Sequence, residues 1–75
     1  MEIYRNLAGD SSVVGYEVGE GNIKVKFSDG SMYLYDNHNT GRMNVEEMQR
    51  LAKEGQGLHG FIKRYVRNDY AEKLA

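Results

Sequence analysis

The sequence contains no cysteine, so neither a disulfide nor a metal site built on thiolates can hold the chain together. It also lacks an apolar run long enough to span a bilayer, and its first residues do not have the architecture of a signal peptide. We therefore expect a cytoplasmic protein without a membrane partner. The 75 residues predict one small domain, which buries only about 60% of the surface that its unfolded chain exposes.

An excess of charge of one sign is absent as well. Ten basic residues stand against eleven acidic ones, which gives a net charge of −1. Bulk charge therefore indicates no class of partner, and affinity for nucleic acid or for a membrane surface would need a local patch.

The residues that commonly carry catalysis or hold metals are few and scattered. His38 and His59 are the only histidines, and without cysteines or a third nearby ligand they predict no metal site. Ser11 and Ser12 have no histidine partner and no nucleophile-elbow motif around them. We therefore expect no cofactor and no enzymatic activity.

What the sequence does have is a clear hairpin pattern. Residues 23–27 (Ile-Lys-Val-Lys-Phe) alternate apolar and polar side chains, as in a half-buried strand. Asp29 and Gly30 then supply a tight turn into Met-Tyr-Leu-Tyr. Together with a preceding segment rich in β-branched residues, this predicts a three-stranded antiparallel meander of residues 12–18, 23–27 and 31–35.

Two helical patterns follow the meander. Asn44, with Glu47 three residues later, predicts an N-cap, and Gly55 predicts the end of that helix. A second helix follows, with apolar residues at helical spacing at Leu58, Phe61, Ile62, Tyr65 and Val66. The predicted fold class is α+β, with a three-stranded antiparallel meander followed by two helices packed on one face (β-β-β-α-α), while the other face is open.

The expected domain occupies residues 12–67, after an N-terminal arm at residues 1–11. Residues 68–75 are either a tail or an extension of the second helix, because no glycine or proline after Gly60 marks its end. The predicted core consists of Ile23, Val25, Phe27, Met48, Leu51, Leu58, Phe61, Ile62 and Tyr65.

The length of the turn decides which side chains of the third strand face the helices. With a two-residue turn, Tyr33 and Tyr35 lie on the open face, beside the two lysines of the second strand. With a three-residue loop that ends in a glycine bulge, the tyrosines join the core, and Met32 and Leu34 lie outside with the lysines. The hydrophobic pattern accepts both turns, so it leaves this choice open.

One series of residues runs through most of the chain: Ser12, Gly15-Tyr16, a strand ending at Phe27, Gly30, Tyr33-Leu34-Tyr35, Ala52, Gly55, Leu58-His59, Ile62 and Tyr65. This series resembles the KTSC domain, named for the C-terminus of some lysyl-tRNA synthetases and also found as free-standing small bacterial proteins. The chain departs from the family in residues 36–41, a longer polar loop without the usual Val-Pro. It also departs at Glu54, where serine is frequent, and at Leu58-His59, where Phe-Asn is usual.

The resemblance covers residues 12–65. It implies a domain without an established function, for which RNA binding has been inferred from the other domains with which it occurs in the same proteins. Relatives commonly carry a polar residue between the two tyrosines. The resemblance therefore also implies that Tyr33 and Tyr35 pack inward beneath the helices.

Two sets of residues are candidate nucleic-acid-binding surfaces. With a two-residue turn, phosphate-binding cations and aromatic platforms for bases lie together at Lys24, Lys26, Tyr33 and Tyr35. The second helix carries a basic patch opposite its apolar stripe, at Lys63, Arg64 and Arg67. The alternatives are an ordinary sheet surface above a tyrosine core and a helix face that is merely solvated.

These patterns predict a small non-enzymatic binding module whose most concrete ligand is RNA or another single-stranded nucleic acid. The alternative is a protein-interaction or self-association module that uses the open sheet face, where Met32 and Leu34 or the tyrosines would form an apolar patch.

Overall fold

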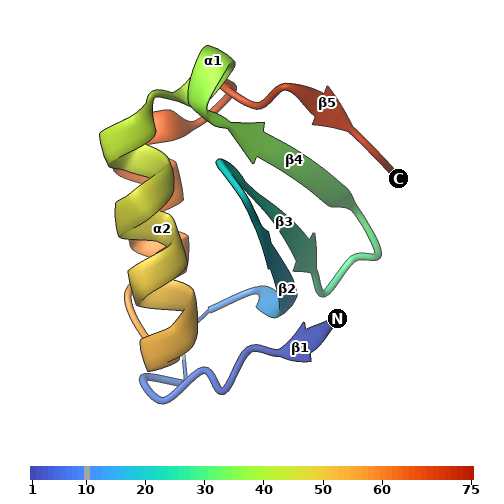
Figure 1. The fold of residues 1–75 in the computed structure, drawn as a ribbon. Coiled ribbons are helices and arrows are strands. Elements are labelled where there is room, and N and C mark those ends of the chain that lie inside the picture. Colours follow the sequence, from blue (N-terminus) through green and yellow to red (C-terminus); the bar gives the residue numbers. More distant parts are fainter. Residues whose placement is uncertain (10) are drawn as a thin grey trace.

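The computed structural model describes residues 1–9 and 11–75, in which an antiparallel sheet is covered on one face by helices (Figure 1). The strands of these residues lie side by side in chain order: β1 (Glu2–Ile3), β2 (Val13–Gly19), β3 (Asn22–Phe27), β4 (Met32–Asp36) and β5 (Glu72–Lys73). The helices are α1 (Asn37–Thr40), α2 (Arg42–Glu54) and α3 (Leu58–Phe61), which continues into the π-helical turn η1 (Ile62–Val66). The predicted α+β class is confirmed, and the expected meander forms the middle of the sheet.

The connection between β3 and β4 is a three-residue loop. The N–H of Phe27 donates to the carbonyl of Ser31 (2.8 Å), and Gly30 adopts a positive φ of 91° in the bulge. In this register Val25 lies opposite Tyr33 on the neighbouring strand. The two-residue turn is therefore excluded.

The loop length determines the orientation of the tyrosines. Tyr35 is only 2% exposed and belongs to the core, and Tyr33 is partly buried on the same face. Lys24 and Lys26 lie on the opposite face, because they alternate with the buried residues of β3. A surface that combines these lysines with the tyrosines is thus not formed.

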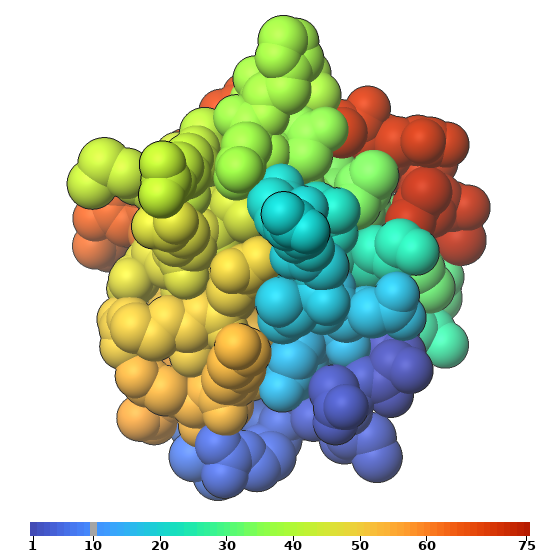
Figure 2. All heavy atoms as spheres, viewed as in Figure 1, coloured from blue at the N-terminus to red at the C-terminus, as the bar shows by residue number. Residues whose placement is uncertain are grey.

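Side chains fill the space between α2 and the sheet that the ribbon leaves open (Figure 2). The predicted core residues that are buried there are Ile23, Val25, Met48, Leu58 and Ile62. Phe27, Leu51 and Phe61 are partly buried and pack against this core. Tyr65 is 58% exposed, so the prediction that it belongs to the core is wrong.

Tyr65 lies within the π-helical turn η1. The N–H of Arg67 donates to the carbonyl of Ile62 (2.7 Å), a bond that spans five residues rather than four. This turn is wider than an α-helical turn, so its side chains do not keep the α-helical spacing on which the sequence prediction was based. Val66 is fully buried, while Tyr65 is turned to solvent, and the helix ends at Val66.

The first predicted helix is correct at its end and wrong at its start. α2 begins at Arg42, with Gly41 at the N-cap position. Asn44 lies inside the helix, where its side-chain amide donates to the carbonyl of Thr40 (3.0 Å), so the predicted cap at Asn44 is wrong. Gly55 ends α2 in a left-handed conformation (φ 84°), as predicted.

Both terminal segments add a strand to an edge of the sheet. β1 pairs with β2, and β5 pairs with β4. Residues 1–11, predicted as an arm, and residues 68–75, predicted as a tail or helix extension, therefore each contribute a strand. Asp10 of the predicted arm lies outside the described residues.

The segment after β1 is tied to the helices. The ring of Tyr4 is buried, and its hydroxyl accepts the backbone N–H of Leu58 (3.2 Å). The guanidinium of Arg5 donates to the carbonyls of Lys53 and Glu54 at the end of α2, at 2.7 and 2.9 Å. These bonds fix the chain entry to β2 against the same helical layer that covers the core.

We expect Tyr35→Ala to lower the free energy of unfolding by about 3 kcal/mol or more, because it removes a buried ring from a small core. Denaturant unfolding measures this loss. Tyr35→Phe keeps the ring and should lose much less, while Lys24→Ala with Lys26→Ala, on the open face, should leave stability nearly unchanged. An equally stable Tyr35→Ala variant would contradict the inward register.

Candidate functional site

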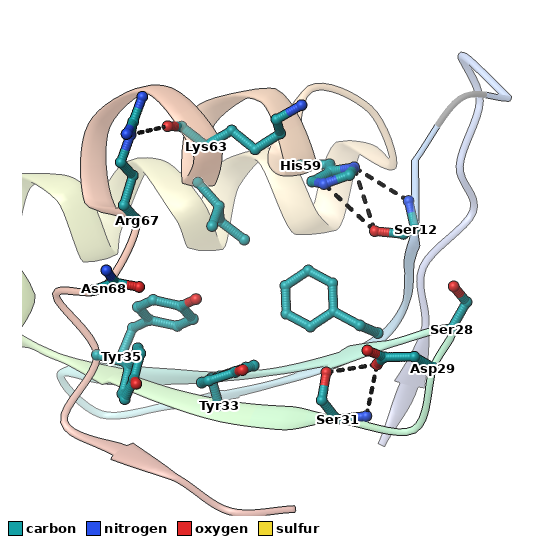
Figure 3. A pocket seen from close by; sticks show the side chains of 13 residues that line it. Ser12, Ser28, Asp29, Ser31, Tyr33, Tyr35, His59, Lys63, Arg67 and Asn68 are labelled. Atoms are coloured by element: carbon teal, nitrogen blue, oxygen red, sulfur yellow. Dashed lines mark hydrogen bonds between the residues drawn. The ribbon is translucent and has the colours of Figure 1, made fainter.

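A groove of about 680 Å³ opens between the inner face of the sheet and the helix formed by α3 and η1 (Figure 3). Figure 3 shows Tyr33, Ser31 and Asp29 on the sheet side and Lys63 and Arg67 on the opposite helical wall, with the charged ends of both directed away from the sheet. We call it the aromatic groove, because it is lined by the rings of Phe27, Tyr33, Tyr35 and Tyr70.

Tyr33 is the central ring of this groove. Its centroid lies 4.7 Å from that of Tyr70 and 5.8 Å from that of Phe27, whose ring meets it edge to face at 81°. Tyr35 lies beside it at 6.5 Å. These contacts hold the ring in place, while Tyr33 and Tyr70 stay only partly buried. A fixed, partly exposed aromatic surface of this kind can stack against a planar ligand.

Positive charge lies beside Tyr33 at Lys73 and on the outer side of the opposite helical wall at Lys63 and Arg67. On the helical wall, Arg67 donates through Nε to the carbonyl of Lys63 (2.9 Å), so the two cations lie one turn apart. On the sheet side, Lys73 of β5 lies opposite Tyr33, with its Nζ 6.0 Å from the ring centroid. Within residues 1–9 and 11–75, none of these three cations forms an ion pair. Their charge is therefore available to an anionic ligand.

The carboxylate of Asp29 lines the groove at its far end, but it is engaged within its own loop. Its Oδ1 accepts the hydroxyl of Ser31 at 2.6 Å and the backbone N–H of Ser31 at 2.9 Å. These two hydrogen bonds lower the pKa of Asp29, so the group is a charged loop cap.

The structure also brings Ser12 beside His59, a contact that the sequence analysis missed. The Nδ1 of His59 accepts the backbone N–H of Ser12 (3.2 Å). The hydroxyl of Ser12 lies 3.5 Å from Nδ1 and 3.4 Å from Nε2. In the ring plane, an oxygen at nearly equal distances from Nδ1 and Nε2 would collide with the carbon between them. The Ser12 hydroxyl therefore lies out of the ring plane, where it does not point along the lone pair of either nitrogen. A serine activated by a general base needs a closer, in-plane bond.

The predicted site residues divide into three groups. Tyr33, Tyr35, Lys63 and Arg67, drawn from two separate candidate surfaces, come together in the aromatic groove. Arg64 lies on the other side of η1, beside Phe61 and Tyr65. Lys24 and Lys26 lie on the open face of the sheet, away from the groove.

Several groove residues were missed because long-range pairing places them. Tyr70 lines the groove and Lys73 lies over the Tyr33 ring only because residues 68–75 pair with β4. His59 meets Ser12 across 47 positions of sequence. The one local indication of this pairing in the sequence was the aromatic residue Tyr70, which lies in a polar tail and had been assigned no role.

Within the described part of the chain, no group of three or more His, Asp or Glu side chains is placed to hold a metal ion. The same residues include no helix with the length and apolar character needed to cross a bilayer. A metal in the groove would thus have no ligand set among them.

The buried Tyr35 phenol makes stability depend on pH. Burial, with added contributions from the nearby phenols of Tyr33 and Tyr70, raises the pKa of Tyr35 from 10.0 to about 12. Below pH 10 the phenol is protonated in both the folded and the unfolded protein. Between pH 10 and 12 the unfolded chain loses this proton first, so unfolding becomes easier. We expect the free energy of unfolding to fall more steeply between pH 10 and 12 for the unmodified protein than for Tyr35→Phe. An equal dependence on pH in the two proteins would contradict the burial of the Tyr35 phenol.

We expect His59→Ala to lower the free energy of unfolding by about 1 kcal/mol or more, because the partly buried N–H of Ser12 loses its acceptor. His59→Asn should recover part of this loss. Its Oδ1 is the same number of bonds from the backbone as Nδ1 and can accept the same hydrogen. Denaturant unfolding of the three proteins checks this order, and equal losses for both variants would show that the bond contributes little.

Comparison with known proteins adds no assignment to this geometry. No family model matches the chain, and neither a similar curated protein nor a similar solved structure was found. The resemblance to the KTSC domain therefore rests on the residues of the sequence, and any functional conclusion rests on the groove.

Proposed function

We propose that this protein is a small non-enzymatic module, similar to KTSC domains, that binds single-stranded nucleic acid in the aromatic groove, with RNA as the first candidate. The observation that carries the proposal is the fixed ring of Tyr33 with the Lys73 cation over it, in a groove whose helical wall carries two further unpaired cations, Lys63 and Arg67.

The chemistry of the groove fits a nucleotide. A base stacks on a partly exposed aromatic ring, and this stacking contributes about 1–3 kcal/mol per base. The phosphates on either side of the base need cations, which Lys73 provides beside the ring and Lys63 and Arg67 provide on the helical wall of the groove. The polar side chains of Ser31 and Asn68 line the same groove and offer hydrogen bonds to a sugar or a base edge.

A solvated helix end is the plainest competing explanation for the basic residues of η1. Cations at the C-terminal end of a helix interact favourably with its dipole without any ligand. That explanation does not account for Lys73, which belongs to β5 and lies over the Tyr33 ring. A cation over the stacking ring, with further unpaired cations on the opposite wall, favours an anionic, planar ligand.

An enzymatic role is less well supported. Ser12 and His59 are the pair that could act as nucleophile and base, and their contact is too long and lies out of the ring plane. The Nδ1 of His59 is also occupied by the backbone N–H of Ser12. We therefore assign His59 a structural role in the wall of the groove.

The second candidate is a protein-interaction or self-association module on the open sheet face. One observation favours it: Met1 and Ile3 are 54% and 81% exposed at the edge of the sheet, and Met32 and Leu34 lie on the outer face of β4, with β2 and β3 between them. Exposed apolar residues grouped on one face are typical of contact surfaces. Lys24 and Lys26 interrupt this patch, which limits its continuous apolar area.

Titration of labelled single-stranded and double-stranded RNA and DNA at two salt concentrations tests the proposal. We expect single strands to bind, with log affinity falling against log salt by about 0.7 for each phosphate contact. No binding at low salt, together with a concentration-dependent dimer in sedimentation, would contradict the groove proposal and favour the open face.

Two double variants with equal charge loss make the test specific. Lys63→Ala with Arg67→Ala should weaken binding and reduce the salt dependence, because both residues line the groove. Lys24→Ala with Lys26→Ala removes the same charge from the opposite face and should change affinity little. Equal losses in both would indicate non-specific attraction rather than a groove site.

A further inference from the structure

A second hollow lies on the other side of η1 from the aromatic groove. It has a volume of about 300 Å³, and it is lined by Leu51, Gly57, Gly60, Phe61, Arg64 and Tyr65. The rings of Phe61 and Tyr65 lie 4.9 Å apart and tilted by 41°, and Tyr65 is 58% exposed. We call it the Phe61–Tyr65 hollow. Its lining shares one feature with that of the groove: aromatic rings beside an unpaired arginine.

The hollow is open because a helical position carries no side chain. Gly60 lies inside α3, where it does not adopt a positive φ, and a Cβ built on it meets nothing within 4 Å. Glycine is the weakest helix former after proline, so the fold itself gives no reason for it at this position. Any larger side chain here would project into the space beside Tyr65.

η1 is a basic ridge between the two depressions. Lys63 and Arg67 line the aromatic groove, and Arg64 lines the Phe61–Tyr65 hollow. Among the residues that the structure describes, none of the three has a carboxylate partner within ion-pair distance. The ridge therefore offers continuous positive charge from one aromatic surface to the other.

From these three features we infer that the Phe61–Tyr65 hollow is a second base-binding subsite. A single strand crosses η1 with successive phosphates on Lys63, Arg64 and Arg67, one base against Tyr33 and a base several nucleotides along against Tyr65. This inference rests on the proposed function and extends it, because it makes the ligand a strand of several nucleotides rather than a mononucleotide. Alternating cations and stacking rings are the usual means by which single strands are bound without sequence preference.

The exposed Tyr65 allows a test that does not disturb the fold. We expect Tyr65→Ala to weaken binding of a labelled oligouridylate octamer by about 5- to 140-fold, which is the stacking range of one base converted at 1.4 kcal/mol per tenfold. The affinity for uridine 5′-monophosphate, which occupies the groove alone, should not change. Tyr65→Phe keeps the ring and should keep the octamer affinity, and thermal melting by circular dichroism checks that each variant is folded.

Gly60 provides an independent pair of variants. Gly60→Ala adds a small group at an open position and should leave octamer binding intact while raising the melting temperature. Gly60→Leu fills the hollow and should weaken octamer binding as Tyr65→Ala does, again without an effect on the mononucleotide.

The outcomes separate this inference from the function on which it rests. If Tyr33→Ala weakens both ligands and Tyr65→Ala weakens neither, the second subsite is refuted and the groove proposal stands. If the unmodified protein binds neither ligand at low salt, both proposals fail. If Tyr65→Ala instead abolishes a concentration-dependent dimer in sedimentation, the hollow is a contact between copies of the chain.

Discussion

The hydrogen bond from the Phe27 N–H to the Ser31 carbonyl sets the register on which the rest of this structure depends. It closes a three-residue loop, and a loop shorter by one residue would exchange the two faces of β4. Tyr33 and Tyr35 would then face solvent, and Met32 and Leu34 would lie beneath the helices. The core would lose its largest buried side chain, and the aromatic groove would lose its central ring. One loop therefore decides both the stability of the domain and the existence of its site.

The parts of the fold that follow from local patterns were predictable. Strict alternation in residues 23–27 identified β3, and Gly55 identified the end of α2. The edge strands were not predictable, because β1 and β5 are each two residues long, which is too short to show the alternation of apolar and polar residues that identifies a strand. They exist because a long-range partner strand is available: β1 on β2, and β5 on β4.

The candidate site was predictable in its residue types and not in its geometry. The sequence pointed to tyrosines with lysines on the sheet and to a basic patch on the second helix. The structure joins the tyrosines to Lys63 and Arg67 of the helix instead of to Lys24 and Lys26 of the sheet. Which cations meet which rings depends on the turn length and on the packing of the helix over the sheet. Neither is encoded in the spacing of the residues themselves.

The features that violate local rules are concentrated around one helix. Gly60 interrupts α3 without a backbone requirement, η1 widens into a π-turn, and Arg67 leaves it with a positive φ of 32°. Each of these is unfavourable in an isolated helix. Around them Tyr65 is exposed, Val66 is buried, and a hollow lies on one side of the ridge and a groove on the other. Proteins commonly break such local rules at functional sites, and both proposed subsites lie beside this helix.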